Sequence, residues 1–304
     1  MQKQTIASHF LCLTWLMLKG FPNLRHMRGF AELPSLKDLE LEEMPNLEEL
    51  WTTSSGFETG EKELAAQYPF PVLYRLCISG CPKLNGSPYF PPSLEHMALE
   101  RSNGQLLSTG RFSHQLPSMH ALVPRLKSLL LIKVTGSSSG WELLQHLTKL
   151  KELEIYSCND LTQLPESMRN LTSLERLCMF ECHAVGTLPD WLGELHSLRR
   201  LELSRGDLKQ FPEAIQHLTS LEHLRIISGP ALTVLPEWIG QLSALRELLI
   251  QYSPALQYLP QSIQRLTALE ELRIYSCPGL AGRYMRGAGP DCHLVSHIPR
   301  VVLY

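Results

Sequence analysis

The chain has 304 residues, a formal net charge of −2 and eight cysteines. This length can form either one large core or an elongated array of repeats. The near-neutral charge excludes the strong positive field that is typical of nucleic-acid-binding proteins. The cysteines are too few for a dense disulfide framework, and no apolar run of about 18 residues predicts a membrane span.

The first part of the chain, residues 1–146, carries short strand-like segments at irregular spacing. Apolar residues alternate with polar ones in these segments, as on a strand with one buried face. The predicted strands centre on Leu16–Leu18, Leu39–Leu41, Leu76–Ile78, Met97–Leu99 and Leu129–Leu131. Polar insertions, WTTSSGFETGEKELAAQYPF and SNGQLLSTGRFSHQLPSMHALVP, lie between some of them and predict surface loops.

The segment ASHFLCLTWLMLKG, residues 7–20, allows two interpretations. It is apolar enough to resemble the hydrophobic part of a secretory signal. It lacks a small-residue cleavage site, however, and its leucines fit the spacing of the repeats described next.

Residues 147–289 divide without a gap into six units of 23 or 24 residues, of which LTKLKELEIYSCNDLTQLPESMRN is the first. Such a period indicates a repeat protein. Each unit begins with a Leu-x-x-Leu-x-Leu pattern, which predicts a short strand. A Leu-Pro or Phe-Pro pair then precedes a short run with apolar residues at helical spacing. Pro165 and its equivalents are expected at the first helical position, where the missing N–H costs nothing.

A unit of strand, turn and short helix cannot bury its apolar face alone, so neighbouring copies stack and share one core. Strands need only ~4.8 Å each while the helical side is wider, so the stack curves with its strands inside. The predicted fold is an α/β leucine-rich-repeat solenoid, a curved horseshoe with a concave parallel sheet of about eleven strands and short helices or 3-10 turns on the convex side. Residues 290–304 leave the repeat and predict a C-terminal cap with a closing strand.

Four cysteines share one position of the repeat, three residues after the second apolar strand residue: Cys81, Cys158, Cys182 and Cys277. Leucine-rich repeats place Asn or Cys there, where the chain leaves the strand. The thiols are therefore expected to be small buried groups that reach carbonyls of the turn. A Cys-x-x-x-Cys spacing occurs twice, but alternating strand faces would separate the two sulfurs, so no zinc site is predicted.

No catalytic or cofactor-binding motif is found in a fitting context. The segment GSSSG, residues 136–140, matches the pattern of a nucleophile elbow, but it does not lie between a strand and a helix with its partners in place. It is interpreted as a flexible polar loop. Glycine-rich phosphate loops, zinc-protease motifs and calcium-binding loops do not occur. The chain is therefore expected to be no enzyme and to hold no cofactor and no metal.

The candidate binding residues are the outward ones of the strands, which project onto the concave face. Packing does not dictate their identity, and aromatic residues among arginines are typical of protein-binding surfaces. Tyr156, Phe180 and Tyr275 are expected to be exposed there. The predicted protein-binding residues are Glu152, Glu154, Tyr156, Arg176, Phe180, Arg200, Glu202, His223, Arg225, Ile227, Glu247, Gln251, Glu271, Arg273 and Tyr275.

The repeats resemble a known family in segments such as LPEWIGQLSALRELLIQYSPALQYLPQSIQRLTALEELRIYSCPGL and in the ending GPDCHLVSHIPRVVLY. The upstream segments FPNLRHM, LPSLKDLELEEMPNLEEL and YPFPVLYRLCISGCPKL extend the resemblance over nearly the whole chain. It is similar to the C-terminal leucine-rich-repeat domain of plant nucleotide-binding leucine-rich-repeat (NLR) resistance proteins, especially the coiled-coil class that is abundant in grasses. One departure is Cys292, which stands where the family commonly has Trp.

The resemblance implies a non-catalytic recognition domain of an intracellular, cytoplasmic immune receptor. In that family the domain senses a pathogen effector or a guarded host protein, and it folds back on the nucleotide-binding domain to hold it inactive. Protein is therefore the expected partner, not nucleic acid. Because no phosphate loop, MHD-type motif or coiled coil precedes these repeats, the sequence is expected to be the tail of a longer receptor, a truncated product or a decoy.

Two other interpretations remain open at this stage. The apolar start and the glycosylation sequons at Asn85 and Asn170 favour an extracellular receptor ectodomain or a secreted inhibitor. Against this, the repeats lack the Gly-x-Ile-Pro turn of plant receptor-kinase ectodomains. A substrate adaptor of a ubiquitin ligase is the other alternative, and it rests on fold analogy alone.

Overall fold

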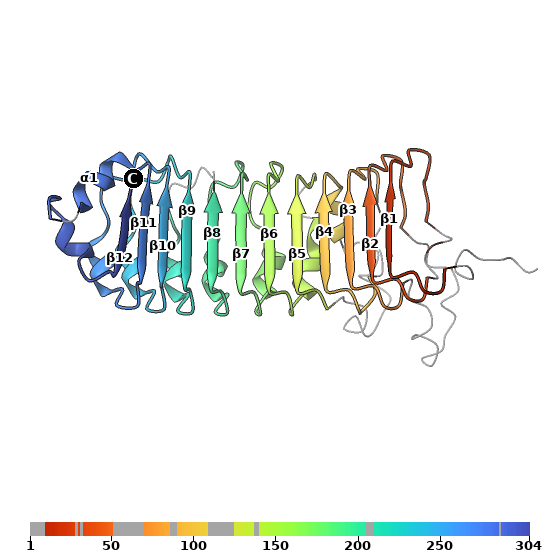
Figure 1. Ribbon diagram of the computed structural model, residues 1–304, viewed down its shortest axis with the longest axis horizontal. Coiled ribbons are helices and arrows are strands. Elements are labelled where there is room, and N and C mark those ends of the chain that lie inside the picture. The colour runs from red at the N-terminus through yellow and green to blue at the C-terminus, as the bar shows by residue number, and fades with distance from the viewer. Residues whose placement is uncertain are drawn as a thin grey trace, which may run out of the picture. The chain divides into compact units, whose positions relative to one another are not determined.

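A computed structural model describes residues 10–27, 30, 33–50, 70–85, 90–108, 125–136, 140–204, 210–285 and 287–304. These residues form two compact units, 1–150 and 151–304. Figure 1 labels the strands of both units. Three predicted loops lie wholly or mostly outside the described residues. The undescribed parts are 51–69 of the first polar insertion, 109–124 of the second, and 137–139 at the centre of GSSSG.

The first unit contains a parallel sheet whose strands follow the order of the chain. Its strands are β1 (Trp15–Lys19), β2 (Asp38–Glu42), β3 (Arg75–Ser79), β4 (His96–Glu100) and β5 (Ser128–Ile132), with 3-10 helices η3 (Gly104–Leu107) and η6 (Glu142–His146). All five strands predicted from the alternating pattern are confirmed. One part of the insertion predicted as a loop is a 3-10 helix, η3, because Leu106 and Leu107 are buried and Asn103 caps it by accepting a bond from Gln105 N.

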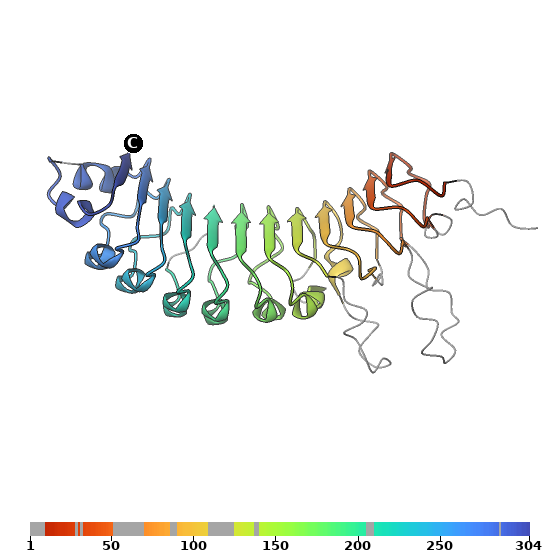
Figure 2. The same cartoon turned by 60° about the horizontal axis from the view of Figure 1, so that its bottom comes forward.

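The second unit repeats the same element pair along the chain, again with parallel strands in chain order. Its strands are β6 (Glu152–Tyr156), β7 (Arg176–Phe180), β8 (Arg200–Ser204), β9 (His223–Ile227), β10 (Glu247–Gln251), β11 (Glu271–Tyr275) and β12 (Arg300–Leu303). The helices are η7 (Glu166–Asn170), η8 (Asp190–Glu194), η9 (Glu213–His217), η10 (Glu237–Gln241), η11 (Gln261–Arg265), α1 (Pro278–Tyr284) and η12 (Cys292–Val295). Figure 2 shows these strands on one side and the 3-10 helices η7–η11 on the other. The predicted solenoid architecture and its closing strand, β12, are confirmed.

The core of the second unit lies between the sheet and the 3-10 helices. The leucine pattern supplies it, because most inward strand residues and helix-facing residues of the repeats are buried; Leu203 of β8 is half-buried. In the first repeat these residues are Leu150, Leu153, Ile155, Cys158, Leu161, Leu164, Met168 and Leu171. Burying this row in each copy makes one continuous hydrophobic core, which no single repeat could form.

The prediction that Pro165 takes the first helical position is wrong by one residue. Pro165 is the N-cap of η7, with an extended backbone (φ −67°, ψ 140°). Its carbonyl accepts the first hydrogen bond from Met168 N at 3.0 Å, which closes a 3-10 turn. Four more prolines, at 189, 212, 236 and 260, have the same role. A cap needs no N–H of its own, so proline suits this position equally well.

Cysteines help to build the tight turns that follow β3, β6, β7 and β11. Cys158 Sγ lies 3.5 Å from the carbonyl oxygen of Tyr156, two residues before it, and Cys277 Sγ lies 3.2 Å from that of Tyr275. The four cysteines of this position are buried. Ser253 occupies the same position and donates to Gln251 O at 3.4 Å. The predicted role of the cysteines, small buried groups that contact turn carbonyls, is confirmed.

Candidate protein-binding surface

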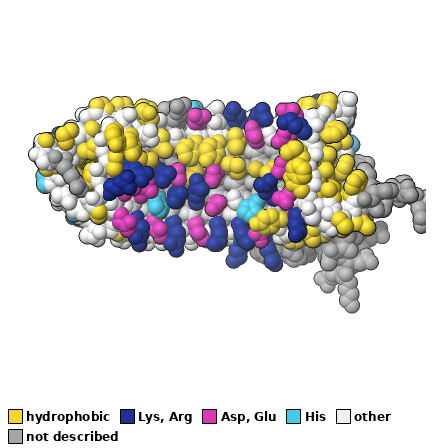
Figure 3. Space-filling model, viewed as in Figure 1, with side chains coloured by type: hydrophobic (Ala, Val, Ile, Leu, Met, Phe, Trp, Pro, Cys, Tyr) yellow, Lys and Arg dark blue, Asp and Glu magenta, His cyan; other side chains and the backbone are white. Residues whose placement is uncertain are grey.

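The outward residues of β6–β12 form one face of the second unit, here called the concave face (Figure 3). The parallel register aligns equal strand positions, so Glu152 lies beside Arg176 and Tyr156 beside Phe180. The predicted binding residues therefore come together in rows that run across the strands. Glu152 is exposed, Glu202 is buried, and the others are half-buried.

Aromatic residues occupy the last position of β6, β7 and β11 and the position after β12, whereas β8, β9 and β10 end in Ser204, Ile227 and Gln251. The rings of Tyr156 and Phe180 stack with their centroids 5.0 Å apart and their planes 5° apart. Tyr275 stacks on Tyr304 of β12 at 5.5 Å and 1°. The expectation that Tyr156, Phe180 and Tyr275 are freely exposed is wrong, because each covers its neighbour and only part of each ring meets solvent.

The phenol of Tyr156 is also held from the side. Its hydroxyl donates a hydrogen bond to Glu154 Oε2 at 2.8 Å. Burial, together with this bond to a carboxylate, raises the pKa of Tyr156 far above its ordinary value. The ring is therefore neutral and fixed in orientation, which suits it to pack against a partner with little loss of entropy.

The first and middle positions of the same strands form a charged row. Its centre is the Glu202 carboxylate of β8, which is only 6% exposed. Ion pairs at 3.8 Å join it to Arg200 and to Arg225, and Arg176 lies 4.0 Å away. The sequence placed Glu202 among the outward residues correctly, but the longer arginine side chains around it remove it from solvent.

The charged row continues along β10 and β11. Glu247 lies 3.1 Å from His223 Nδ1, 3.2 Å from an Arg225 nitrogen and 3.5 Å from an Arg273 nitrogen. Burial alone would raise the pKa of Glu247, but the His223 and arginine contacts outweigh it and lower this pKa. Glu271 pairs with Arg273 at 2.6 Å.

Two residues of this surface were missed by the sequence prediction. Arg300 on β12 lies 2.9 Å from Glu271, and Tyr304 follows the same strand. Both occupy positions equivalent to those of earlier strands, since Arg300 pairs with Glu271 in the sheet. Aligning the terminal strand-like run with the preceding strand, so that Arg300 lies beside Glu271, would have found both residues.

Cys178, the middle residue of β7, is buried beneath this surface instead of projecting into solvent. Arg176 Nε donates to its sulfur at 3.1 Å. Burial raises the pKa of Cys178 to about 11, so the thiol is protonated at neutral pH and is a poor nucleophile or metal ligand. Within the described residues, no three potential metal ligands converge.

The outward face of the first unit has a different composition. On β1, Trp15 and Met17 are 51% and 39% exposed. On the neighbouring strands Arg75 pairs with Glu40 at 2.6 Å and with Asp38 at 3.3 Å. Lys19 of β1 also pairs with Glu42 of β2 at 2.7 Å, so exposed apolar residues and paired charges lie together on this face.

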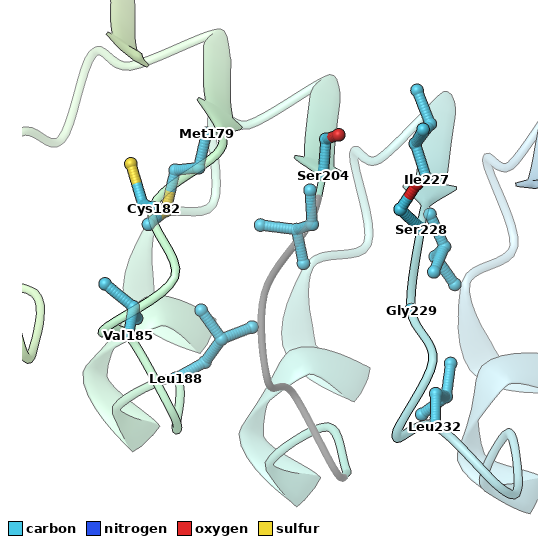
Figure 4. A pocket seen from close by; sticks show the side chains of 11 residues that line it. Met179, Cys182, Val185, Leu188, Ser204, Ile227, Ser228, Gly229 and Leu232 are labelled. Carbon is cyan, nitrogen blue, oxygen red and sulfur yellow. The ribbon is translucent and has the colours of Figure 1, made fainter. Parts of the chain in front are cut away.

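A small apolar hollow of about 40 Å³ lies at the carboxyl ends of β7–β9 (Figure 4). Its labelled lining residues include Met179, Leu188, Ile227 and Gly229, and Gly229 lacks a side chain where other repeats place cysteine or serine. A hollow of this size holds a few water molecules and is small for a cofactor or substrate.

Comparisons with known proteins agree with this architecture. Residues 187–281 match a family described as a leucine-rich repeat region. Among solved structures, the chain is similar to the leucine-rich-repeat domain of the type III effector XopL, with a TM-score of 0.50 and 23% identity over 77% of this chain and 70% of that one. Comparison with curated proteins finds no match. The chain therefore has the fold of a leucine-rich-repeat solenoid.

Two further solved structures are similar at lower scores. One is an internalin, InlF, from Listeria monocytogenes, with a TM-score of 0.42 and 15% identity over 98% of this chain and 89% of that one. The other is a plant peptide hormone receptor, RGFR1, in complex with RGF2, with a TM-score of 0.49 and 17% identity over 94% of this chain and 46% of that one. Every helix of the described residues falls short of the length and apolarity that a membrane span needs.

Proposed function

We propose that this domain is the protein-recognition part of an intracellular plant immune receptor. It binds a pathogen effector or a guarded host protein on the concave face of the second unit, and it also contacts the nucleotide-binding domain of the receptor to hold it inactive. The resemblance of its repeats and its ending to plant NLR resistance proteins supports the receptor class.

The observation that carries the proposal is the composition of the concave face. In the second unit, two stacked aromatic pairs, Tyr156–Phe180 and Tyr275–Tyr304, share the outward face of the strands with a row of ion-paired arginines. Aromatic and arginine side chains dominate the binding energy of protein interfaces. The solenoid core does not need them, because it is built from the inward leucines of the same strands.

The test compares two variants that change the same residue types. The concave variant replaces Tyr156, Phe180, Arg200 and Arg225 with Ala. The control variant replaces the exposed residues Tyr252, Tyr258, Arg199 and Arg246 of the same unit with Ala. Each variant and the wild type are expressed separately in leaf cells, and the proteins that co-purify with each are identified by mass spectrometry.

Proteins that bind the concave face are expected to be lost in the concave variant and kept in the control variant. An identical set of partners in both variants would remove the concave face as the binding surface. A fluorescent fusion tests the location, and the proposal requires it inside the cell, with Asn85 and Asn170 unmodified. Glycans on these two residues would favour the extracellular alternative instead.

A further inference from the structure

Three guanidinium groups surround a single buried carboxylate at the centre of the concave face. Arg176 comes from β7, Arg200 from β8 and Arg225 from β9, and all three reach Glu202. Glu202 by itself balances only one of these three positive charges. Two of the arginines also have a closer carboxylate, because Arg176 lies 3.3 Å from Glu154 of β6 and Arg225 lies 3.2 Å from Glu247 of β10.

The contacts within this cluster are loose. The separations of 3.8–4.0 Å exceed the range of a hydrogen bond. Glu202 Oε1 is buried and has no hydrogen-bond partner among the described residues. Glu202 is also the only ion-pair partner that the described residues give Arg200. Arg200 therefore keeps hydrogen-bond donors that a second carboxylate could use.

The arginines of this surface are more exposed than the carboxylates they pair with, so a partner meets positive charge first. The carboxylates lie below and the guanidinium groups lie above, nearer to solvent. The exposed fractions of the acidic side chains are 23% for Glu154, 6% for Glu202, 12% for Glu247 and 16% for Glu271. Those of the arginines are 33% for Arg176, 35% for Arg200, 28% for Arg225, 31% for Arg273 and 69% for Arg300. The exposed Glu152 on β6 marks the end of this positive region.

We propose that Arg176, Arg200 and Arg225 bind the carboxylates of an acidic segment of a partner protein that crosses the strands in an extended conformation. Three adjacent strands span ~10 Å between the outer two, and alternate residues of an extended peptide lie ~7 Å apart. Two acidic side chains at alternate positions therefore fit over the three arginines. This inference deepens the proposed function and rests on it, since it names the chemistry of the segment that the concave face recognises.

The probe for this proposal is a fluorescent synthetic peptide of alternating Glu and Ser. Its affinity for the full chain is measured by fluorescence anisotropy at low and high salt. Arg200→Ala is expected to weaken binding about tenfold, since a hydrogen bond between charged groups is lost, and salt is expected to weaken the wild-type complex. Arg246→Ala removes the same charge from an exposed ion pair with Glu270 outside the cluster, and it should leave binding unchanged.

Glu202→Gln gives the sharpest test, because binding and stability should move in opposite directions. The substitution keeps the shape but removes the negative charge that competes with the peptide, so the peptide should bind several-fold more tightly. Folding should become less stable, since three arginines lose their shared counter-charge. If Glu202 only positions the arginines, the same variant will weaken binding, and the proposal is then wrong.

Three other results would overturn the proposal. They are equal effects of Arg200→Ala and Arg246→Ala, equal binding of a Lys–Ser peptide, and tighter binding of a single-stranded oligonucleotide of the same charge. Failure here remains distinct from failure of the proposed function. If the acidic peptide does not bind while the concave variant still loses its partners, only the inference about an acidic segment fails.

Discussion

Tyr284→Phe is a defined perturbation of the C-terminal end of the second unit. Tyr284 is the last residue of α1 and is fully buried. Its hydroxyl oxygen accepts a hydrogen bond from the backbone N–H of Leu259 at 2.7 Å, and its hydroxyl lies 3.5 Å from the Leu259 carbonyl oxygen. The phenol thus ties α1 to the segment that precedes η11.

The expected loss follows from what the substitution removes. Phenylalanine keeps the ring, so the core loses almost no packing volume. The N–H of Leu259, itself 3% exposed, loses its partner away from water. A buried donor without a partner costs about 1–3 kcal/mol, and the free energy of unfolding should fall by that amount.

Equilibrium urea unfolding, followed by tryptophan fluorescence, measures this loss. Trp191 and Trp238 report on the same unit. Tyr258→Phe is the matched control, because it removes the same hydroxyl next to Leu259 from a side chain that is 50% exposed. The control should change the free energy of unfolding by less than about 0.5 kcal/mol. Equal values for the two variants would refute the assigned role of the Tyr284 hydroxyl.

The pH dependence provides a second readout of the same hydroxyl. Burial raises the pKa of Tyr284, partly offset by the bond from Leu259 N. Because the folded state favours the neutral phenol, its contribution is fully present below the unfolded pKa of about 10 and is lost as pH rises through the folded pKa. The stability difference between the wild type and Tyr284→Phe should therefore shrink in alkaline solution.

Two further predictions concern the convex side and the charged row. A Cβ on Gly240 would lie 2.6 Å from Ser262 O, so Gly240→Ala should lower the free energy of unfolding by about 1–3 kcal/mol. Gly186→Ala is the control, because its Cβ would have no neighbour within 4 Å and the change should be neutral or slightly stabilising. Urea titrations of both variants measure the difference. The lowered pKa of Glu247 gives stability that is present above the unfolded pKa of about 4.3 and is lost as pH falls through the folded pKa. Glu247→Gln should therefore lower the free energy of unfolding at neutral pH and approach the wild-type value in acid. Unfolding curves of the two proteins, measured at neutral and at acid pH, test this, and an equal difference between the proteins at both pH values would contradict it.

The fold could be predicted from the sequence because the repeat pattern encodes burial directly. Alternation of Leu153 and Ile155 with polar residues specifies which side of a strand faces the core. A one-residue shift would expose the whole row, so the register allows no alternative. The same reasoning located all of the strands in the less regular first unit, where only the spacing between strands varies.

The depth of the outward residues could not be predicted in the same way. Whether Glu202 is buried depends on arginines from β7 and β9, which lie about 24 residues away in sequence and next to it in space. The stacking of Tyr156 on Phe180 likewise depends on side-chain orientation across two strands. The pattern of one strand specifies the direction of a side chain but not what its neighbours cover.

The turns that follow five strands of the second unit show how the scaffold leaves this surface free to vary. The residue that follows the strand has a positive φ after β6, β7, β9, β10 and β11, although none of these residues is glycine: Ser157, Glu181, Ser228, Tyr252 and Ser276. The first four donate their N–H to the carbonyl oxygen of the last residue of the next strand, and Ser276 donates to that of Tyr304, directly after β12, so the ladder extends one step into the turn. A left-handed residue costs about 1–2 kcal/mol, and the ladder bond together with the buried group that follows it offsets this cost. Because backbone bonds and a small cysteine or serine hold the turn, the outward side chains of the strands take no part in it, and their identities can follow the partner instead of the fold.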